Sequence, residues 1–200
     1  MSHDTWFHRL VRRAVRPLVG TPVTPNHLTA ARLATGLAAA WWFTGGDGAQ
    51  AWPGAVLFLV SMVLDRADGE LARQSRRTSR FGHLFDLTTD AACNALAMIA
   101  IGFGLRHGGL GTLAPWLGLI AGLAIAWVLL AMVRMERAQG QGSATMSSFA
   151  GFDPDDALVI VPLAMVLGFG DALIVAAAIG APLAAVVIGV ELRRRRAGRG

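Results

Sequence analysis

The chain has 200 residues, of which 54% are hydrophobic and only 16% are charged, and its formal net charge is +5. Soluble domains carry roughly 25% charged residues, so this composition excludes an ordinary soluble domain and a disordered chain and predicts an integral membrane protein. The one cysteine, Cys93, has no partner for an intrachain disulfide, which excludes a disulfide-stapled secreted domain and a cysteine metal cluster and leaves Cys93 as a small core residue.

Residues 1–23 form a basic amphipathic segment. Between His8 and Arg16, arginines recur three and four residues apart among leucine, valine and alanine. This pattern predicts a short cytoplasmic helix on an anionic leaflet. We favour it over a signal peptide, because the apolar run is too short and no A-x-A site follows. Residues 24–192 are then predicted to form the transmembrane domain, and residues 193–200 a basic cytoplasmic tail.

Six apolar segments follow, and a helix needs about 20 residues to cross the hydrocarbon core. Thr24 and Pro25 are typical of the start of the first helix, and the second continues as a helix past the membrane into Asp65. The predicted fold is an all-α bundle of six transmembrane helices preceded by the interfacial helix. The spans are expected at 27–43, 51–64, 83–105, 113–133, 156–167 and 172–190.

The arginines predict the topology. They gather near the N-terminus, after the second and fourth spans and at the C-terminus, whereas Arg106 falls on the opposite side. By the positive-inside rule both termini are cytoplasmic. The 18 basic residues are all arginine and alanine and glycine are abundant, which hints at a bacterial protein of the cytoplasmic (inner) membrane. Gly118-x-x-x-Gly122 is a candidate packing face for a homodimer.

Acidic residues concentrate between positions 64 and 90. Asp65 and Asp68 are three residues apart, and Asp86 and Asp90 four, so each pair shares one helix face near a cytoplasmic end. Four unpaired carboxylates at a membrane boundary are costly, so a positive group, either arginine or a divalent metal, is expected among them. An all-oxygen set suits Mg²⁺ or Mn²⁺, and two ions would clamp a pyrophosphate. Four nearby arginines could bind phosphate: Arg73, Arg76, Arg77 and Arg80.

The acidic segment matches a family signature residue for residue. It reads Asp65-x-x-Asp68-Gly69-x-x-Ala72-Arg73, eight residues, Gly82-x-x-x-Asp86-x-x-x-Asp90. This string resembles, without gap or substitution, the signature of the CDP-alcohol phosphatidyltransferases. The six-span plan and the opening of the first span, Pro25-Asn26-x-x-Thr29-x-x-Arg32, also resemble that family. The two glycines fit places where helices, or a helix and a ligand, approach closely.

The resemblance implies an enzyme that moves a phosphatidyl group from CDP-diacylglycerol to a hydroxyl of a polar alcohol and releases CMP. It implies two divalent cations, Mg²⁺ or Mn²⁺, held by Asp65, Asp68, Asp86 and Asp90, with Asp90 also the general base. A carboxylate near the acceptor hydroxyl can take its proton, and the cations offset charge on the departing nucleotide. The residues implied to bind the CDP-lipid are Asn26, Thr29, Gly69, Ala72, Arg73, Ser79 and Gly82.

The acceptor is less well indicated by the sequence. Arginines at the inner ends of spans four and six could form an anion pocket for inositol phosphate or glycerol phosphate, or could simply meet lipid phosphates. Asp153 to Asp156 are typical of a helix cap rather than a second metal site, and the polar loop 140–150 could fold over the active site. The candidate acceptor arginines are Arg134, Arg137, Arg193 and Arg194.

Other functions are less compatible with these residues. A reversed enzyme, in which CDP carries the headgroup and diacylglycerol is the acceptor, would use the same metal core. A cation or proton transporter would place acids near the bilayer midplane, not at a rim among arginines. A purely structural membrane protein gives no reason for four converging acids. The arginine-rich tail directly follows a span, so we expect it to meet lipid headgroups and not nucleic acid.

Overall fold

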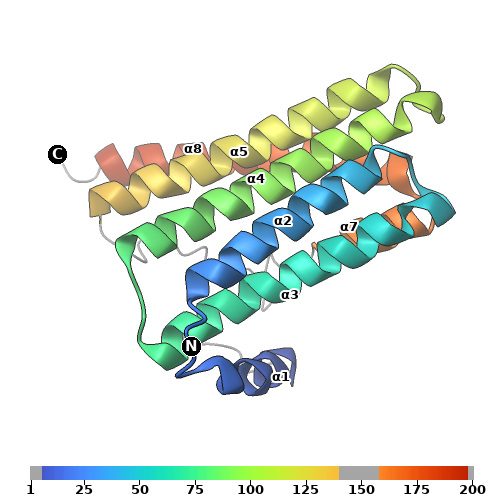
Figure 1. The fold of residues 1–200 in the computed structure, drawn as a ribbon. Helices are drawn as coiled ribbons and strands as arrows, with labels where there is room; N and C mark the ends of the chain where they lie inside the picture. Colours follow the sequence, from blue (N-terminus) through green and yellow to red (C-terminus); the bar gives the residue numbers. More distant parts are fainter. Residues whose placement is uncertain (1–5, 140–157, 198–200) are drawn as a thin grey trace.

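The computed structural model describes residues 6–139 and 158–197, and the regular structure within them is helical. Figure 1 shows the long helices side by side, with α1 against the end of α3. The α-helices are α1 (Trp6–Val15), α2 (Pro25–Phe43), α3 (Trp52–Ser75), α4 (Arg80–Gly104), α5 (Leu113–Gln139), α7 (Ile160–Val166) and α8 (Gly170–Ala197). Short 3-10 turns are η1 (Arg16–Leu18), η2 (Gly48–Ala51) and η3 (Leu105–His107).

Helix α2 lies at the centre of the half of the bundle that carries the acids. It packs against both α3 and α4, while α5 packs between α4 and α8, and α7 packs on α3. Gly36 permits this arrangement, because a Cβ there would collide with the side chains of Cys93 on α4 and Ser61 on α3. Cys93 is a buried core residue, as predicted.

Four helical segments are long and apolar enough to cross a membrane: Gly48–Ser75, Arg80–His107, Leu113–Ala131 and Gly170–Val190. The regular structure of the described residues is all helical, and these four helices point to an integral membrane protein. The predicted count of six is not confirmed. The 19 residues of α2 include Asn26, His27 and Arg32, which lower its apolarity, and α7 has only 7 residues. The first and fifth spans therefore stay predictions.

The start of α2 and the continuation of α3 past the membrane boundary agree with the sequence analysis, whereas α5 and α8 extend beyond the expected spans. Helix α2 begins at Pro25, where the Thr24 amide donates to His27 Nδ1 at 3.2 Å. Helix α3 continues past the predicted membrane boundary to Ser75 and ends at Arg76, whose φ of 54° is left-handed and turns the chain sharply. A short connection then leads into α4, so the two acid-bearing helices are adjacent in sequence and antiparallel (Figure 1).

Helix α1 forms as predicted, but its inner face meets protein. Val11 and Val15 are 6% and 3% exposed and pack in a small cluster with the fully buried Leu71 of α3. The physical reason is that α3 extends beyond the bundle, where the apolar side chain of Leu71 would be exposed to water without α1. Arg13 and Arg16 are exposed on the outward side, and their contact with a lipid leaflet stays a prediction.

The Gly118-x-x-x-Gly122 pair packs within the chain, which contradicts its use as a homodimer face. A Cβ on Gly118 would lie 2.6 Å from the carbonyl oxygen of Met98, and one on Gly122 would lie 2.7 Å from that of Ala95. The two glycines therefore let α5 approach the backbone of α4. Asp153 to Asp156, the loop 140–150 and the side chain of Arg137 lie outside the described residues.

Candidate active site

Three aspartates from two helices meet at the site predicted from the sequence. Carboxylate oxygens of Asp65 and Asp68 on α3 and of Asp86 on α4 all lie within 4.8 Å of one another. Asp68 is buried at 3% exposure. The i and i+3 spacing on α3 directs both of its acids toward α4, as the helical periodicity predicts. Three carboxylates so close together form a donor set that fits a hard divalent cation.

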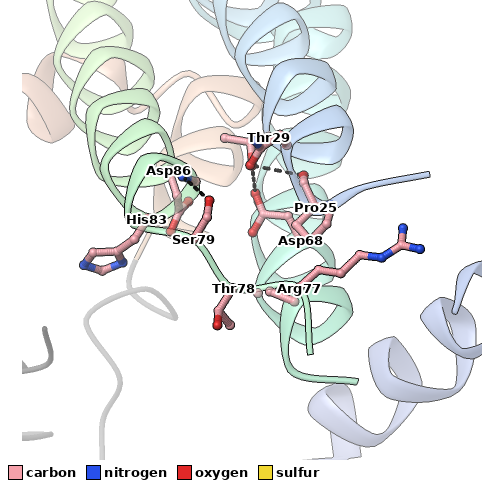
Figure 2. A pocket seen from close by; sticks show the side chains of 12 residues that line it. Pro25, Thr29, Asp68, Arg77, Thr78, Ser79, His83 and Asp86 are labelled. Atoms are coloured by element: carbon pink, nitrogen blue, oxygen red, sulfur yellow. Dashed lines mark hydrogen bonds between the residues drawn. The ribbon is translucent and has the colours of Figure 1, made fainter. Parts of the chain in front are cut away.

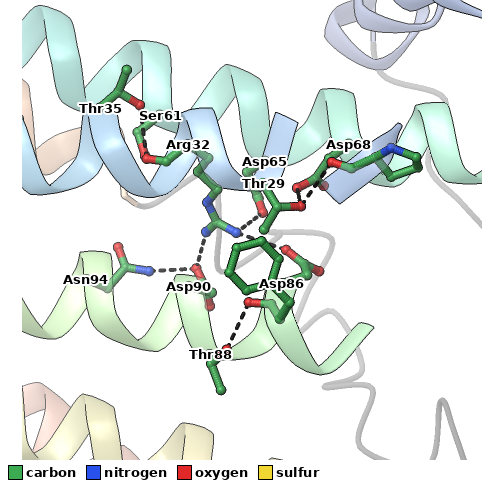
Figure 3. A network of polar contacts seen from close by, with 12 residues as sticks. Thr29, Arg32, Thr35, Ser61, Asp65, Asp68, Asp86, Thr88, Asp90 and Asn94 are labelled. Carbon is green, nitrogen blue, oxygen red and sulfur yellow. Dashed lines mark hydrogen bonds and ion pairs between the residues drawn. The ribbon is translucent and has the colours of Figure 1, made fainter. Parts of the chain in front are cut away.

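Arg32 of α2 supplies the positive group expected among the acids. Its side chain is 5% exposed, and its Nη1 lies 2.5 Å from Asp65 Oδ1 and 3.0 Å from Asp86 Oδ1. Its Nη2 lies 2.6 Å from Asp90 Oδ1. Figure 3 shows the guanidinium between the acids of α3 and those of α4. One arginine therefore joins three helices through three ion pairs.

Two hydrogen bonds from neutral side chains add to these ion pairs. Thr29 Oγ1 donates to Asp68 Oδ2 at 2.6 Å, and Asn94 Nδ2 donates to Asp90 Oδ1 at 2.7 Å (Figure 3). Asp90 stands outside the close group of three carboxylates and is held instead by Arg32 and Asn94. Both donors contact the same oxygen, so they orient the carboxylate of Asp90 while its second oxygen stays outside these two contacts.

Arg32 is the site residue whose role was missed in the sequence. The sequence predicts an arginine or a metal among the acids without indicating which arginine, and it assigns those from Arg73 to Arg80 to phosphate binding. Arg73 instead pairs with Glu70, at 2.8 Å from Nη2 to Oε2, and Arg12 of α1 pairs with the same glutamate at 3.3 Å. The usable signal was the three-residue spacing of Thr29 and Arg32, which places both on one face of α2.

A pocket opens beside the acid cluster, between α2, α3 and the start of α4. Figure 2 shows Asp68 and Thr29 on one side of it and Ser79 and Asp86 on the other. Ser79 caps α4 by accepting a hydrogen bond from the amide of Gly82 at 2.9 Å. The residues that line the pocket are Pro25, Asn26, Thr29, Asp68, Gly69, Ala72, Arg77, Thr78, Ser79, Gly82, His83 and Asp86.

The lining includes most of the residues expected to bind the CDP-lipid. Six of these line the pocket: Asn26, Thr29, Gly69, Ala72, Ser79 and Gly82. Arg73 is not among the lining residues, because its guanidinium turns toward Glu70. Three further lining residues, Arg77, Thr78 and His83, come from the segment that joins α3 to α4 and from the first turn of α4.

The two signature glycines serve different purposes. A Cβ on Gly82 would lie 2.8 Å from Asn26 Oδ1, so this glycine permits the contact between α4 and α2. A Cβ on Gly69 would meet only Arg73 Nη1, at 3.8 Å, and would otherwise project into open space beside the pocket. Gly82 therefore allows α4 and α2 to pack closely, whereas Gly69 leaves room for a ligand.

The sequence matches the family model for CDP-alcohol phosphatidyltransferase over residues 22–192. The chain belongs to this family. No curated protein matches the chain. Members transfer a substituted phosphate group from a CDP-alcohol to an alcohol acceptor and use divalent cations. The close group of carboxylates in this transferase is suited to such cations.

Three of the arginines expected at the acceptor are not among the described residues that line the pocket of this transferase. Arg134 near the end of α5 and Arg193 and Arg194 near the end of α8 are exposed. Helices α5 and α8 are packed together, and Figure 1 places these ends at the same end of the bundle as the start of α4. An acceptor site that includes them would lie beyond the pocket described above.

Proposed function

We propose that the protein transfers a phosphatidyl group from CDP-diacylglycerol to a hydroxyl of a polar, phosphorylated alcohol such as inositol phosphate or glycerol phosphate, and releases CMP. One observation carries this proposal: Asp68 and Asp86 belong both to the close group of carboxylates and to the wall of the pocket. A nucleotide in the pocket therefore has its pyrophosphate beside the carboxylates. Family membership supports a CDP-alcohol as the donor.

Two Mg²⁺ or Mn²⁺ ions are the proposed cofactors. Asp65, Asp68 and Asp86 would hold them, with Asp90 as a fourth ligand, since oxygen donors suit these ions. When bound, the ions offset the negative charge of the pyrophosphate and of the CMP that leaves. Gly69, Ala72 and Gly82 have little or no side chain, so the nucleotide can approach the helix backbones at these positions.

Asp90 is the proposed general base. The acceptor oxygen forms a bond with the phosphorus that carries the lipid, and the bond from that phosphorus to the oxygen of CMP breaks. The proton of the acceptor hydroxyl passes to the carboxylate of Asp90. Arg32 and Asn94 both contact Oδ1 of this carboxylate, which supports an arrangement with the other oxygen directed toward the acceptor.

The substrates reach this site from different sides in our proposal. The lipid donor enters sideways from the bilayer, and the polar acceptor enters from the cytoplasm of a bacterial cell, with the acceptor phosphate near Arg134, Arg137, Arg193 and Arg194. Arg77 and His83, at the mouth of the pocket, are further candidates for contact with the nucleotide. Arg73 pairs with Glu70, which keeps its guanidinium outside the pocket. We expect Arg73 to contact the nucleotide from that position.

The decisive test is release of CMP by the purified protein in nanodiscs. CDP-diacylglycerol and Mg²⁺ or Mn²⁺ are supplied with glycerol phosphate, inositol phosphate, inositol or serine in separate reactions. We expect release that depends on a phosphorylated acceptor and stops with EDTA. Release with inositol or serine alone would contradict the acceptor class but keep the donor. Activity only with a CDP-headgroup and diacylglycerol would contradict the proposed direction of transfer.

A further inference from the structure

Arg32 lies outside the acidic signature, yet it contacts three of its four aspartates. It is 4% exposed on α2, and its Nη1 and Nη2 groups reach Asp65 on α3 and Asp86 and Asp90 on α4. The residue is also held by its backbone, because the hydroxyl of the buried Ser61 donates to its carbonyl oxygen at 3.1 Å. Its position is therefore built by three helices together.

The aspartates of the cluster outnumber the one arginine that contacts three of them. Counted together, the four aspartates and Arg32 carry a formal charge of −3, and Asp68 accepts a hydrogen bond from the neutral hydroxyl of Thr29. Carboxylates this close repel one another, and burial strengthens the repulsion at Asp68, which is 3% exposed. A single guanidinium is thus placed where it reduces that repulsion most, between the acids of the two helices (Figure 3).

Hydrogen bonding alone does not explain this placement. The Nε of Arg32 is buried, and none of the described residues accepts a hydrogen bond from it. A buried donor without an acceptor is unfavourable. The side chain therefore gives up one hydrogen bond and directs both terminal nitrogens at carboxylates, which indicates that its charge is what the site uses.

We propose that Arg32 is a positioning residue that acts as the resident cation of the acid cluster. It holds the acids of α3 and α4 together when divalent ions are absent, and it shares their neutralisation when the ions are bound. This inference rests on the metal site in the proposed function. Because Arg32 and the ions act on the same carboxylates, their contributions to the stability of the folded protein overlap.

The overlap between the stabilising effects of Arg32 and of the ions can be measured. An ion that binds only the folded protein raises its stability. Without Arg32, the metal-free protein loses the cation that offsets the repulsion, and the ions then relieve more of it. Metal should therefore stabilise a variant that lacks this charge more than it stabilises the unaltered protein, and by linkage the variant should bind metal more tightly.

The experiment uses the full chain in detergent and records the apparent unfolding midpoint in EDTA and in Mn²⁺, together with Mn²⁺ affinity. For Arg32→Gln we expect a lower midpoint in EDTA, a Mn²⁺-induced rise at least about 4 °C larger than in the unaltered protein, and Mn²⁺ affinity at least about fivefold higher. Arg32→Lys keeps the charge, so its rise should stay close to that of the unaltered protein.

Ser61→Ala is the matched control. It removes the hydrogen bond to the carbonyl of Arg32 without changing any charge. Its midpoint should fall by the same amount in EDTA and in Mn²⁺. If Arg32→Gln behaves in this way, Arg32 only anchors the helices and the proposal is wrong. Weaker Mn²⁺ binding by Arg32→Gln would also overturn it, because Arg32 would then organise the ligands for the ion.

The remaining outcomes are equally decisive. Recovery of folded Arg32→Gln in Mn²⁺ but not in EDTA would support the proposal, whereas no recovery in either buffer would contradict it. If the unaltered protein shows no rise with Mn²⁺, the metal site itself fails, and this inference fails with it. A clear rise in the unaltered protein and an equal rise in Arg32→Gln would remove this inference alone.

Discussion

The two ends of the helix bundle use carboxylates in opposite ways. At the turn end, which carries the loops between α2 and α3, α4 and α5, and α7 and α8, Asp47 accepts from the amide of Gly170 at 3.0 Å and Asp171 accepts from that of Gly109 at 3.1 Å. At the site end, which carries the aspartates from 65 to 90, three carboxylates converge on Arg32. At the turn end, carboxylates join loops by accepting from backbone amides. At the site end, several carboxylates share one cation, which leaves negative charge for a ligand.

Asp171 illustrates the difference. It lies in the first turn of α8, yet its Oδ2 accepts a hydrogen bond from the loop after α4. The carboxylate that receives the Gly170 amide at the start of α8 is Asp47, far away in sequence. A position near a helix end therefore does not distinguish the two kinds of acid. The contacts do: an acid that joins loops accepts from backbone amides, whereas an acid of the binding site pairs with Arg32.

The largest effect is expected from Asp90→Asn at the site end. Loss of the general base should lower CMP release at least about 100-fold, while the unfolding midpoint stays close to that of the unaltered protein, since asparagine can still accept from Arg32 and Asn94. Asp171→Asn is the matched change at the turn end and should keep full activity. Substantial CMP release by folded Asp90→Asn would refute the assignment of the base.

A smaller effect should follow from Gly82→Ala. Its new methyl group would press on Asn26 and narrow the pocket, so the KM for CDP-diacylglycerol should rise about tenfold, equivalent to about 1.4 kcal/mol. Gly180→Ala on α8 is the control, because nothing lies within 4 Å of its Cβ position. Steady-state kinetics of both variants test this, and an unchanged KM in Gly82→Ala would contradict the pocket as the donor site.

The smallest effect on activity is expected at the turn end. A Cβ on Gly104 would collide with the carbonyl oxygen of Phe43 and crowd Gly46, so Gly104→Ala should cost about 1–3 kcal/mol of stability. For a chain of this size each kcal/mol lowers the midpoint by about 2–4 °C. Thermal unfolding in detergent measures the loss, and KM should not change. A raised KM with no loss of stability would contradict the contrast between the two ends.

Much of the site was predictable because its residues are close in sequence and regular in spacing. The spacings of Asp65, Asp68, Asp86 and Asp90 on helices place the acids on defined faces. A sharp connection after Ser75 then brings α3 and α4 together. The residues expected to bind the CDP-lipid came from the family resemblance, and six of the seven line the pocket.

What the sequence could not predict depends on packing between distant helices. Nothing near Arg32 in the chain indicates that α2 lies between α3 and α4. Arg73 pairs with Glu70, three residues earlier on the same helix, and is not among the residues that line the pocket, so its contact with the nucleotide stays a prediction. The partners of Arg32 lie on two other helices, and residue spacing along α2 does not indicate them.

The junction at Glu70 ties the first helix to the rest of the enzyme. Glu70 binds Arg12 from α1 and Arg73 from the signature, while Leu71 beside it is covered by the valines of α1. The amino-terminal helix is thus matched to one short stretch of α3 by both charge and shape. A chimaera that exchanged this helix between two transferases would lose both the ion pair and the apolar contact. The helix and that stretch of α3 must therefore be exchanged together.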